Sequence, residues 1–217
     1  MIEHVYRRAS QARTVDAVLV ATDDERIAAA VDGFGGTAVM TRADHMTGTD
    51  RLAEVADVLE SEVIVNVQGD EPLIAPDAID AAIELVLTHP EVQIGTLRRR
   101  IDDPADLHNP AVVKLVVDAG GRALYFSRAA IPFTRSGHPA PTCWRHLGLY
   151  AYRRSFLLAI ATLGRTPLEQ AEGLEQLRVI EHGFTIGTAD TLSDTIGVDT
   201  PEDLERVRRL VGPAVQG

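Results

Sequence analysis

Short apolar runs of strand length alternate along this chain with stretches of helical period, and this alternation limits the fold more than any other feature. Eight runs are typical of buried strands: residues 17–21, 37–40, 63–67, 93–97, 112–117, 123–126, 147–152 and 184–189. Six stretches are typical of helices: residues 24–32, 50–60, 76–88, 153–163, 167–181 and 201–211. Such alternation predicts βαβ units, and therefore a mainly parallel sheet covered by helices on both faces.

One segment departs from this alternation. The β-rich stretches at 112–117 and 123–126 are joined by the turn sequence Asp-Ala-Gly-Gly at 118–121. A short glycine-containing turn between two strands predicts an antiparallel hairpin. We therefore expect one Rossmann-like α/β domain over residues 1–217, with a mixed, mainly parallel sheet and an antiparallel segment inserted at about 109–152.

Charge and cysteine content exclude several classes of function. The formal net charge of −11 argues against a nucleic-acid-binding protein, which needs clustered Lys and Arg. Cys143 is the only cysteine, which excludes an intramolecular disulfide and a CxxC metal or redox site. Lys114 is the only lysine, so nearly every cation is an Arg, the residue suited to bidentate pairing with carboxylate or phosphate.

Membrane and export signals are not evident in the sequence. No run approaches the ~20 consecutive apolar residues that cross a bilayer. Residues 1–8 lack the basic-then-apolar order of a signal peptide. We therefore expect a cytoplasmic protein with no membrane partner.

Two carboxylates occupy positions that suit a metal ion. Asp70 follows the strand at 63–67 almost at once, at the carboxyl end where open α/β sheets bind ligands. Asp199 precedes the helix at 201–211 and can supply a second ligand if its strand lies next to that of Asp70. Mg²⁺ usually takes one or two protein carboxylates and completes its shell with phosphate oxygens and water. The alternative interpretation of Asp70 is a polar turn after a strand, and that of Asp199 is an acidic residue favoured by a helix N-terminus.

The polar loop at residues 41–51 ends in a helix start and suits a nucleotide. The hydroxyls of Thr47 and Thr49, together with Gly48 and exposed amides, can hold a base or ribose. Arg42 can contact a phosphate. A solvated loop with a Ser/Thr turn has the same pattern, so the loop by itself does not decide between the two.

Alternation in the strand around 144–152 places a row of polar and aromatic side chains on one face. The row consists of His146, Gly148, Tyr150 and Tyr152, opposite Leu147, Leu149 and Ala151. His146 and Tyr150 can then point together into a pocket for a polyhydroxylated ligand. A half-buried core histidine and a packing tyrosine are the alternative. We interpret the other six histidines as surface groups.

Three further polar residues suit the same ligand. Glu175 and Gln176 flank the apolar stripe of the predicted helix at 167–181 and can reach a bound sugar, or can be ordinary helix-surface residues. Arg128 directly follows a predicted strand and can offer a cation to a carboxylate, or can form a surface ion pair.

Taken together and in order, these motifs resemble one family. The segments that carry the resemblance are residues 41–54, 65–72, 109–114, 123–132, 145–150, 167–178 and 197–208. The chain resembles the CMP-Kdo synthetases (3-deoxy-manno-octulosonate cytidylyltransferases) over essentially its whole length, and is less similar to the CMP-sialic acid synthetases. A metal-dependent glycosyltransferase is a weaker alternative, because no Asp-x-Asp motif ends a plausible strand.

The resemblance implies a nucleotidyltransferase fold of the GT-A-like type and a specific reaction. That reaction is the Mg²⁺-dependent transfer of CMP from CTP to 3-deoxy-manno-octulosonate (Kdo), with release of pyrophosphate, for lipopolysaccharide biosynthesis in the cytoplasm. The family also implies a homodimer, with the insert at about 109–152 serving sugar binding and dimerisation.

The resemblance also implies roles for individual residues. Asp70 and Asp199 match the metal-binding, catalytic aspartates. The residues that match the nucleotide side are Arg42, Thr47, Gly48, Thr49 and Gln68. Those that match the sugar side are Arg128, His146, Tyr150, Glu175 and Gln176, with the arginine as the natural partner of the Kdo carboxylate.

The beginning of the chain differs from the family pattern. Family members start with a strand and a loop carrying Arg, Ser and Lys, and this sequence opens on the helix that follows them. We expect the 217 residues as written to be inactive or nearly so as a synthetase, with a start codon assigned too far downstream as the simplest explanation. A non-catalytic homologue that binds sugar or nucleotide, or assists assembly, is the alternative.

Overall fold

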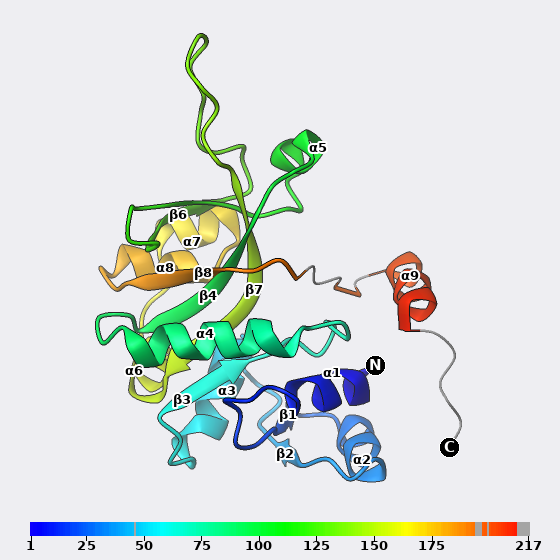
Figure 1. Ribbon diagram of the computed structural model, residues 1–217. Helices are drawn as coiled ribbons and strands as arrows, with labels where there is room; N and C mark the ends of the chain where they lie inside the picture. Colours follow the sequence, from blue (N-terminus) through cyan, green and yellow to red (C-terminus); the bar gives the residue numbers. More distant parts are fainter. Residues whose placement is uncertain (46, 194–196, 199, 212–217) are drawn as a thin grey trace.

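The computed structural model describes residues 1–45, 47–193, 197–198 and 200–211, and is a mixed α/β structure (Figure 1). Its strands are β1 (Val20–Thr22), β2 (Ala38–Met40), β3 (Val63–Asn66), β4 (Ile94–Arg100), β5 (Lys114–Val117), β6 (Ala123–Ser127), β7 (Trp144–Arg153) and β8 (Ile186–Asp190). Its helices are α1 (Ile2–Ala9), α2 (Glu25–Gly33), α3 (Gly48–Asp57), α4 (Pro76–Thr88), α5 (Pro104–His108), α6 (Arg154–Ile160), α7 (Pro167–Glu172), α8 (Gln176–Glu181) and α9 (Pro201–Val211).

Most of the predicted elements are confirmed. Each of the eight predicted strands has a counterpart, and α4 and α9 have the predicted bounds. The single helix predicted at 167–181 is wrong, because Gly173 adopts a left-handed conformation (φ 62°) that ends α7 before α8 begins. The short helix α5 was not predicted.

The strands form two sheets among the described residues. A six-stranded sheet has the order β6-β5-β7-β4-β8, with β3 also paired to β7, and β1 pairs with β2 in a separate parallel ribbon. The expected parallel pairing holds for β1–β2 and β4–β8. Parallel pairing does not dominate the large sheet, because β7 lies in its middle and runs antiparallel to β3, β4 and β5.

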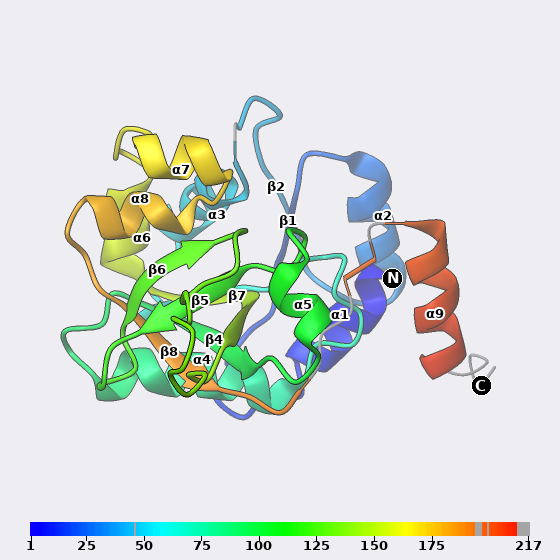
Figure 2. The same ribbon diagram turned by 90° about the horizontal axis from the view of Figure 1, so that it is seen from above.

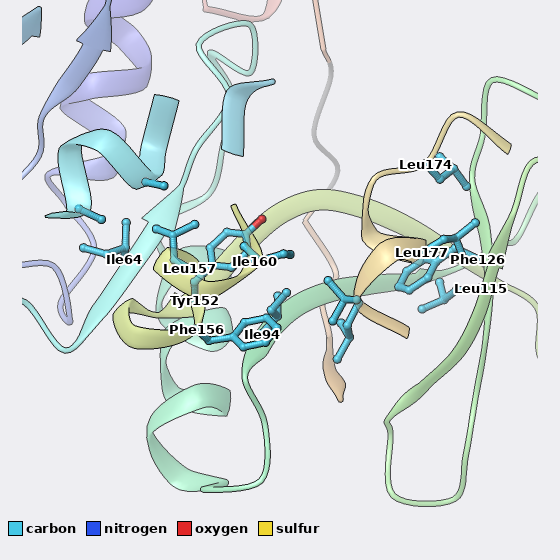
Figure 3. Close-up of a cluster of buried hydrophobic side chains, with 14 residues drawn as sticks. Ile64, Ile94, Leu115, Phe126, Tyr152, Phe156, Leu157, Ile160, Leu174 and Leu177 are labelled. Atoms are coloured by element: carbon cyan, nitrogen blue, oxygen red, sulfur yellow. The ribbon is translucent and has the colours of Figure 1, made fainter. Parts of the chain in front are cut away.

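Helices cover both faces of the large sheet, as alternating apolar strands require (Figures 1 and 2). On one face, α4 packs through Ile79, Ala82 and Val86 onto sheet residues that include Leu97 and Leu149. On the other face, α3, α6 and α8 enclose the second cluster of buried side chains shown in Figure 3. Alternate residues of a strand pack into the two cores. A shift of one residue in register would therefore move each side chain into the opposite core.

Strand β7 contributes to both cores. Leu147, Leu149 and Ala151 pack in the α4 core, whereas Tyr152 packs in the core on the opposite face. This confirms the alternation expected for the strand. The connection from β6 to β7 projects away from the layers in Figure 1, and Phe133 within it is 89% exposed. Among the described residues, no helix has the length and apolar character needed to cross a membrane.

Candidate active site

The predicted sugar-side residues of β7 lie where the pairing along one edge of this strand changes from β5 to β3. Residues 150–153 of β7 pair with β3, and residues 144–145 pair with β5. The intervening stretch at 146–149 therefore lies between the two neighbours, and it carries His146 and Gly148. A Cβ added to Gly148 would meet no heavy atom within 4 Å, so there is open space on the face shared by His146 and Tyr150.

His146 is held by a hydroxyl and two aromatic rings. Its Nε2 lies 2.9 Å from the Oγ1 of Thr96 on β4. Its ring packs edge-on against Phe126 (centroids 5.0 Å apart) and at a tilt against Tyr150 (5.3 Å). Burial lowers the pKa of His146 to about 3, because the charged imidazolium is poorly solvated there. The imidazole is therefore neutral near pH 7 and acts in hydrogen bonding rather than as a cation.

Two tyrosines continue this row along β7. The rings of Tyr150 and Tyr152 lie 5.9 Å apart between centroids. Burial, followed by the charge of Glu175, raises the pKa of Tyr152, and burial raises the pKa of Tyr150 well above its ordinary value. Both phenols stay protonated and can donate hydrogen bonds.

Thr49 joins the start of α3 to the segment between α7 and α8. Its Oγ1 donates to Oε2 of Glu175 at 3.1 Å, and its side chain also shares a hydrogen bond with Tyr152. The other carboxylate oxygen of Glu175, Oε1, is buried and has no hydrogen-bond partner in the described part of the chain. Buried polar atoms are rarely left unpaired in native proteins, so this oxygen is an acceptor available to a ligand.

Behind this cluster, a buried ion pair fixes the α7–α8 corner. Arg178 donates to both oxygens of Glu169, at 2.9 and 2.5 Å. Both side chains are almost fully buried, and Gln176 is 8% exposed beside them. The structure thus brings together three of the five predicted sugar-side residues, His146, Tyr150 and Glu175, and a fourth, Gln176, follows Glu175 in the chain.

The structure gives the fifth predicted sugar-side residue, Arg128, other partners. Its Nε donates to the carbonyl of Glu172 at 2.9 Å and its Nη1 to the carbonyl of Pro110 at 3.1 Å. The sole lysine, Lys114, is fully buried and donates to the carbonyls of Asn109, Val112 and Arg128. Lys114 therefore holds the backbone around Arg128 in place.

The predicted metal ligand Asp70 lies beyond the end of β3. The backbone N–H of Val198 donates to the carbonyl of Asp70 at 2.9 Å, so the segment next to Asp199 returns to this loop. Asp199 itself is outside the described residues, and Gln68 is exposed. Burial, and then the charge of Asp70, raises the pKa of Glu71 to about 7.

The residues near Asp70 suit a magnesium ion bound together with a phosphate. The described residues contain no group of three or more His, Cys, Asp or Glu side chains placed to hold a metal. Mg²⁺ does not require such a group, because one or two carboxylates suffice when phosphate oxygens and water complete the shell. The half-buried Asp70 at a strand's carboxyl end meets this requirement.

The predicted nucleotide loop precedes α3. Thr47 is the N-cap of that helix and its side chain accepts a hydrogen bond from the backbone of Asp50, and the exposed Gly48 follows it. Arg42 pairs with Asp44 at 3.3 Å and lines a hollow of about 620 Å³ beside α3 and α6. That hollow is also lined by Asp44, Asp50, Glu54 and Asp57, which disfavours an anionic ligand there.

Sequence reasoning missed several residues of the site. Thr96 and Tyr152 were not assigned a role, although a threonine in an apolar strand and the alternation of β7 were both available as signals. His45 was expected at the surface, which is wrong: its side chain is 6% exposed and pairs with Glu54.

Comparisons with known proteins agree with this geometry. The model of the family described as Cytidylyltransferase matches residues 1–186. The 3-deoxy-manno-octulosonate cytidylyltransferase of Solibacter usitatus is 52% identical over 210 residues, which cover 97% of this chain and 83% of that protein. The enzyme of the same name from Geobacter sulfurreducens is 52% identical over 217 residues, which cover 95% of this chain and 87% of that protein.

Solved structures give the same assignment. A structure of CMP:2-keto-3-deoxy-manno-octonic acid synthetase complexed with CTP matches with a TM-score of 0.92 and 44% identity, covering 97% of this chain and 86% of that one. The 4-diphosphocytidyl-2C-methyl-D-erythritol synthase from Anaerococcus prevotii, at 12% identity and a TM-score of 0.62, shares the fold alone. The chain therefore belongs to the cytidylyltransferase family, and within it to the group of 3-deoxy-manno-octulosonate cytidylyltransferases.

Proposed function

We propose that this protein transfers CMP from CTP to Kdo and releases pyrophosphate. The observation that carries the proposal is the polar cluster on β7 and α8, combined with 52% identity to proteins named for this activity. The cluster presents a neutral imidazole, two phenols and a carboxylate oxygen that accepts no hydrogen bond within the described chain. Such a set of donors and acceptors suits the hydroxyl groups of a sugar acid.

In this proposal the sugar binds over β7. His146, Tyr150, Glu175 and Gln176 contact its hydroxyls, and Thr49 holds Glu175 in position through the 3.1 Å hydrogen bond. These contacts hold the attacking hydroxyl in one orientation, which replaces a bimolecular encounter by a positioned reaction. Arg128 meets the Kdo carboxylate only if it exchanges its present carbonyl partners for the ligand.

The nucleotide binds along the loop before α3 and the end of β3. Thr47, Gly48, Thr49 and Gln68 hold the cytidine and ribose, and Arg42 meets the phosphates only if it leaves Asp44 and the acidic hollow that it lines. Asp70 and Asp199 would hold Mg²⁺, which when bound polarises the α-phosphate and stabilises the pyrophosphate leaving group. The contact between Val198 and Asp70 supports a shared position for the two carboxylates.

We place the protein in the cytoplasm, in lipopolysaccharide biosynthesis, as a homodimer. The chain forms one cytidylyltransferase domain in this proposal, with residues 109–152 as a sugar-binding and dimerisation insert. Support for a second copy comes from exposed apolar side chains on this insert, Leu124 (55% exposed) and Phe133 (89% exposed).

The test is pyrophosphate release with CTP, Kdo and Mg²⁺ by the protein purified from its source organism, with CMP-Kdo identified by mass; the 217 residues as written are assayed in parallel, to test the expectation that they are inactive or nearly so. Release should require all three, and chelation should abolish it. Asp70→Asn should lower the rate at least about 10-fold, because loss even of a residue that only supports a metal ligand costs about 10- to 100-fold, whereas Asp102→Asn, at an exposed position, should not. No CMP-Kdo, or preferential use of N-acetylneuraminate, would contradict the proposal.

A further inference from the structure

The β4–β7 pairing contains an irregularity beside the sugar side of the site. Thr96 is opposite Tyr150, but the next residue, Leu97, is opposite Leu147. Gly148 and Leu149 are therefore extra residues on β7, which form a β-bulge. Bulges redirect side chains and are frequent next to active sites.

The hydroxyl of Thr96 lies inside this bulge. Thr96 is fully buried, and its Oγ1 is 2.8 Å from the carbonyl oxygen of Leu149 and 3.2 Å from that of Leu147. A carbonyl oxygen can only accept, so the single hydroxyl proton of Thr96 is donated to this pair, mainly to Leu149. The hydroxyl then has only lone pairs left for any other neighbour.

The remaining neighbour is Nε2 of His146, at 2.9 Å. Because Thr96 has no second proton, the hydrogen bond between them requires a proton on Nε2. His146 is neutral near pH 7, since burial lowers its pKa to about 3. A neutral imidazole protonated at Nε2 has an unprotonated Nδ1, which is an acceptor.

We propose that Thr96 is a positioning residue that fixes the Nε2-protonated tautomer of His146, so that Nδ1 accepts a hydrogen bond from a hydroxyl of the sugar acid. This rests on the proposed function, in which His146 contacts the sugar. The rings of Phe126 and Tyr150 hold the imidazole plane, and Thr96 decides which nitrogen carries the proton. The site thus differs chemically from one in which His146 donates to its ligand.

The first measurement is the tautomer of His146 in the ligand-free protein, read from long-range ¹⁵N–¹H correlations and assigned with His146→Gln. The expected result is a proton on Nε2 in the wild type. A proton on Nδ1 would overturn the proposal. This measurement needs no turnover, so it is independent of whether the protein makes CMP-Kdo.

The second measurement compares three variants. Thr96→Val keeps the shape of the side chain and removes its hydroxyl. In this variant the His146 proton should no longer prefer Nε2, and the KM for Kdo should rise about 10-fold, as for one lost hydrogen bond. The KM for CTP should not change. Thr96→Ser should restore both. Thr188→Val removes a buried hydroxyl from the partner position on β8, where it bonds the carbonyl of Gly121, and should change neither.

The outcomes distinguish a positioning role of Thr96 from a packing role, and both from a failure of the proposed function. A Thr96→Val protein that keeps both the tautomer and the KM for Kdo would overturn the proposal. If Thr96→Val does not fold, the wild-type tautomer and the Thr96→Ser variant still decide. Failure of the wild type to use Kdo would contradict the proposed function, whereas an Nε2 proton that depends on Thr96 would still support the tautomer assignment.

Discussion

Removing the carboxylate of Glu175 should weaken sugar binding without weakening the fold. Its Oε1 is buried, lies 4.0 Å from Nη2 of Arg178 and accepts no hydrogen bond within the described chain, so it is available for one hydrogen bond from a ligand hydroxyl. A hydrogen bond to a charged group contributes about 1.5–3 kcal/mol, which corresponds to roughly a 10- to 150-fold change in affinity. Glu175→Ala should raise the KM for Kdo by that factor and leave the KM for CTP within about twofold.

The effect on stability distinguishes a binding role from a structural one. Glu175→Ala removes one hydrogen bond from Thr49, which costs about 1 kcal/mol, and a 4.0 Å ion pair with Arg178, which keeps its two hydrogen bonds to Glu169. It also removes a buried oxygen that accepts no hydrogen bond, whose desolvation costs about as much as the lost hydrogen bond contributes. We therefore expect the free energy of unfolding in urea to change by less than about 1 kcal/mol. Glu91→Ala, at an exposed position, is the matched control.

The assay is pyrophosphate release at saturating CTP with varied Kdo. If the KM for Kdo in Glu175→Ala stays within twofold of the Glu91→Ala value, the assignment of Oε1 to the ligand is wrong. Thr49→Val should raise the same KM by a smaller factor. Because Thr49 acts through Glu175, the double variant should be no worse than Glu175→Ala alone.

Three other perturbations test the site and its support. Gly148→Leu places a side chain in the open space on the β7 face and should raise the KM for Kdo at least 10-fold, which kinetics at fixed CTP will show. Asp80→Asn should lower the unfolding free energy by about 2–4 kcal/mol at pH 7, measured in urea, because the buried carboxylate accepts from the backbone and side chains of Arg13 and Thr14. Burial raises the pKa of Asp80, but these hydrogen bonds outweigh it and the pKa is lowered, so the stabilisation is present above about pH 4 and is lost as pH falls through the folded-state pKa. Because the folded-state pKa of His146 is about 3, its neutral ring contributes stability above pH 6.5, and this stability is lost as pH falls toward 3. His146→Gln should therefore reduce the slope of the unfolding free energy against pH, measured near pH 4.5, by about 1.4 kcal/mol per pH unit. Equal slopes in the two proteins would contradict the burial of a neutral ring.

The sequence was sufficient for the elements with a clear period. Helix α4 matched its predicted bounds because Pro76 begins it and its apolar stripe is unbroken. The alternation of β7 correctly separated the face of Tyr150 from that of Leu149, since the two cores impose it. The break at Gly173 was missed because an isolated glycine within a helical pattern does not show whether it takes a left-handed conformation.

The partners of polar groups were harder to predict. The sequence identified Arg128 as a cation near a sugar, but whether a guanidinium is free depends on carbonyls such as those of Glu172 and Pro110, which only the folded chain brings to it. In the same way, the contact between Val198 and Asp70 joins residues far apart in the sequence. Tertiary contacts of this kind carry no local pattern.

Thr96 shows why a buried polar residue can mark a site more clearly than an exposed one. Valine has nearly the same shape and is favoured in strands, so packing alone gives no reason for a hydroxyl at a position with no exposed surface. Burying a hydroxyl costs free energy unless it is hydrogen-bonded, and here it meets two carbonyls of the bulge and the ring of His146. The two carbonyls of the bulge account for the proton that the hydroxyl donates, whereas among the described residues its lone pairs accept from His146 alone. Strand β7 therefore packs one face on α4, and at its bulge it meets the buried hydroxyl of Thr96 on β4, which orients the imidazole of His146 for a ligand.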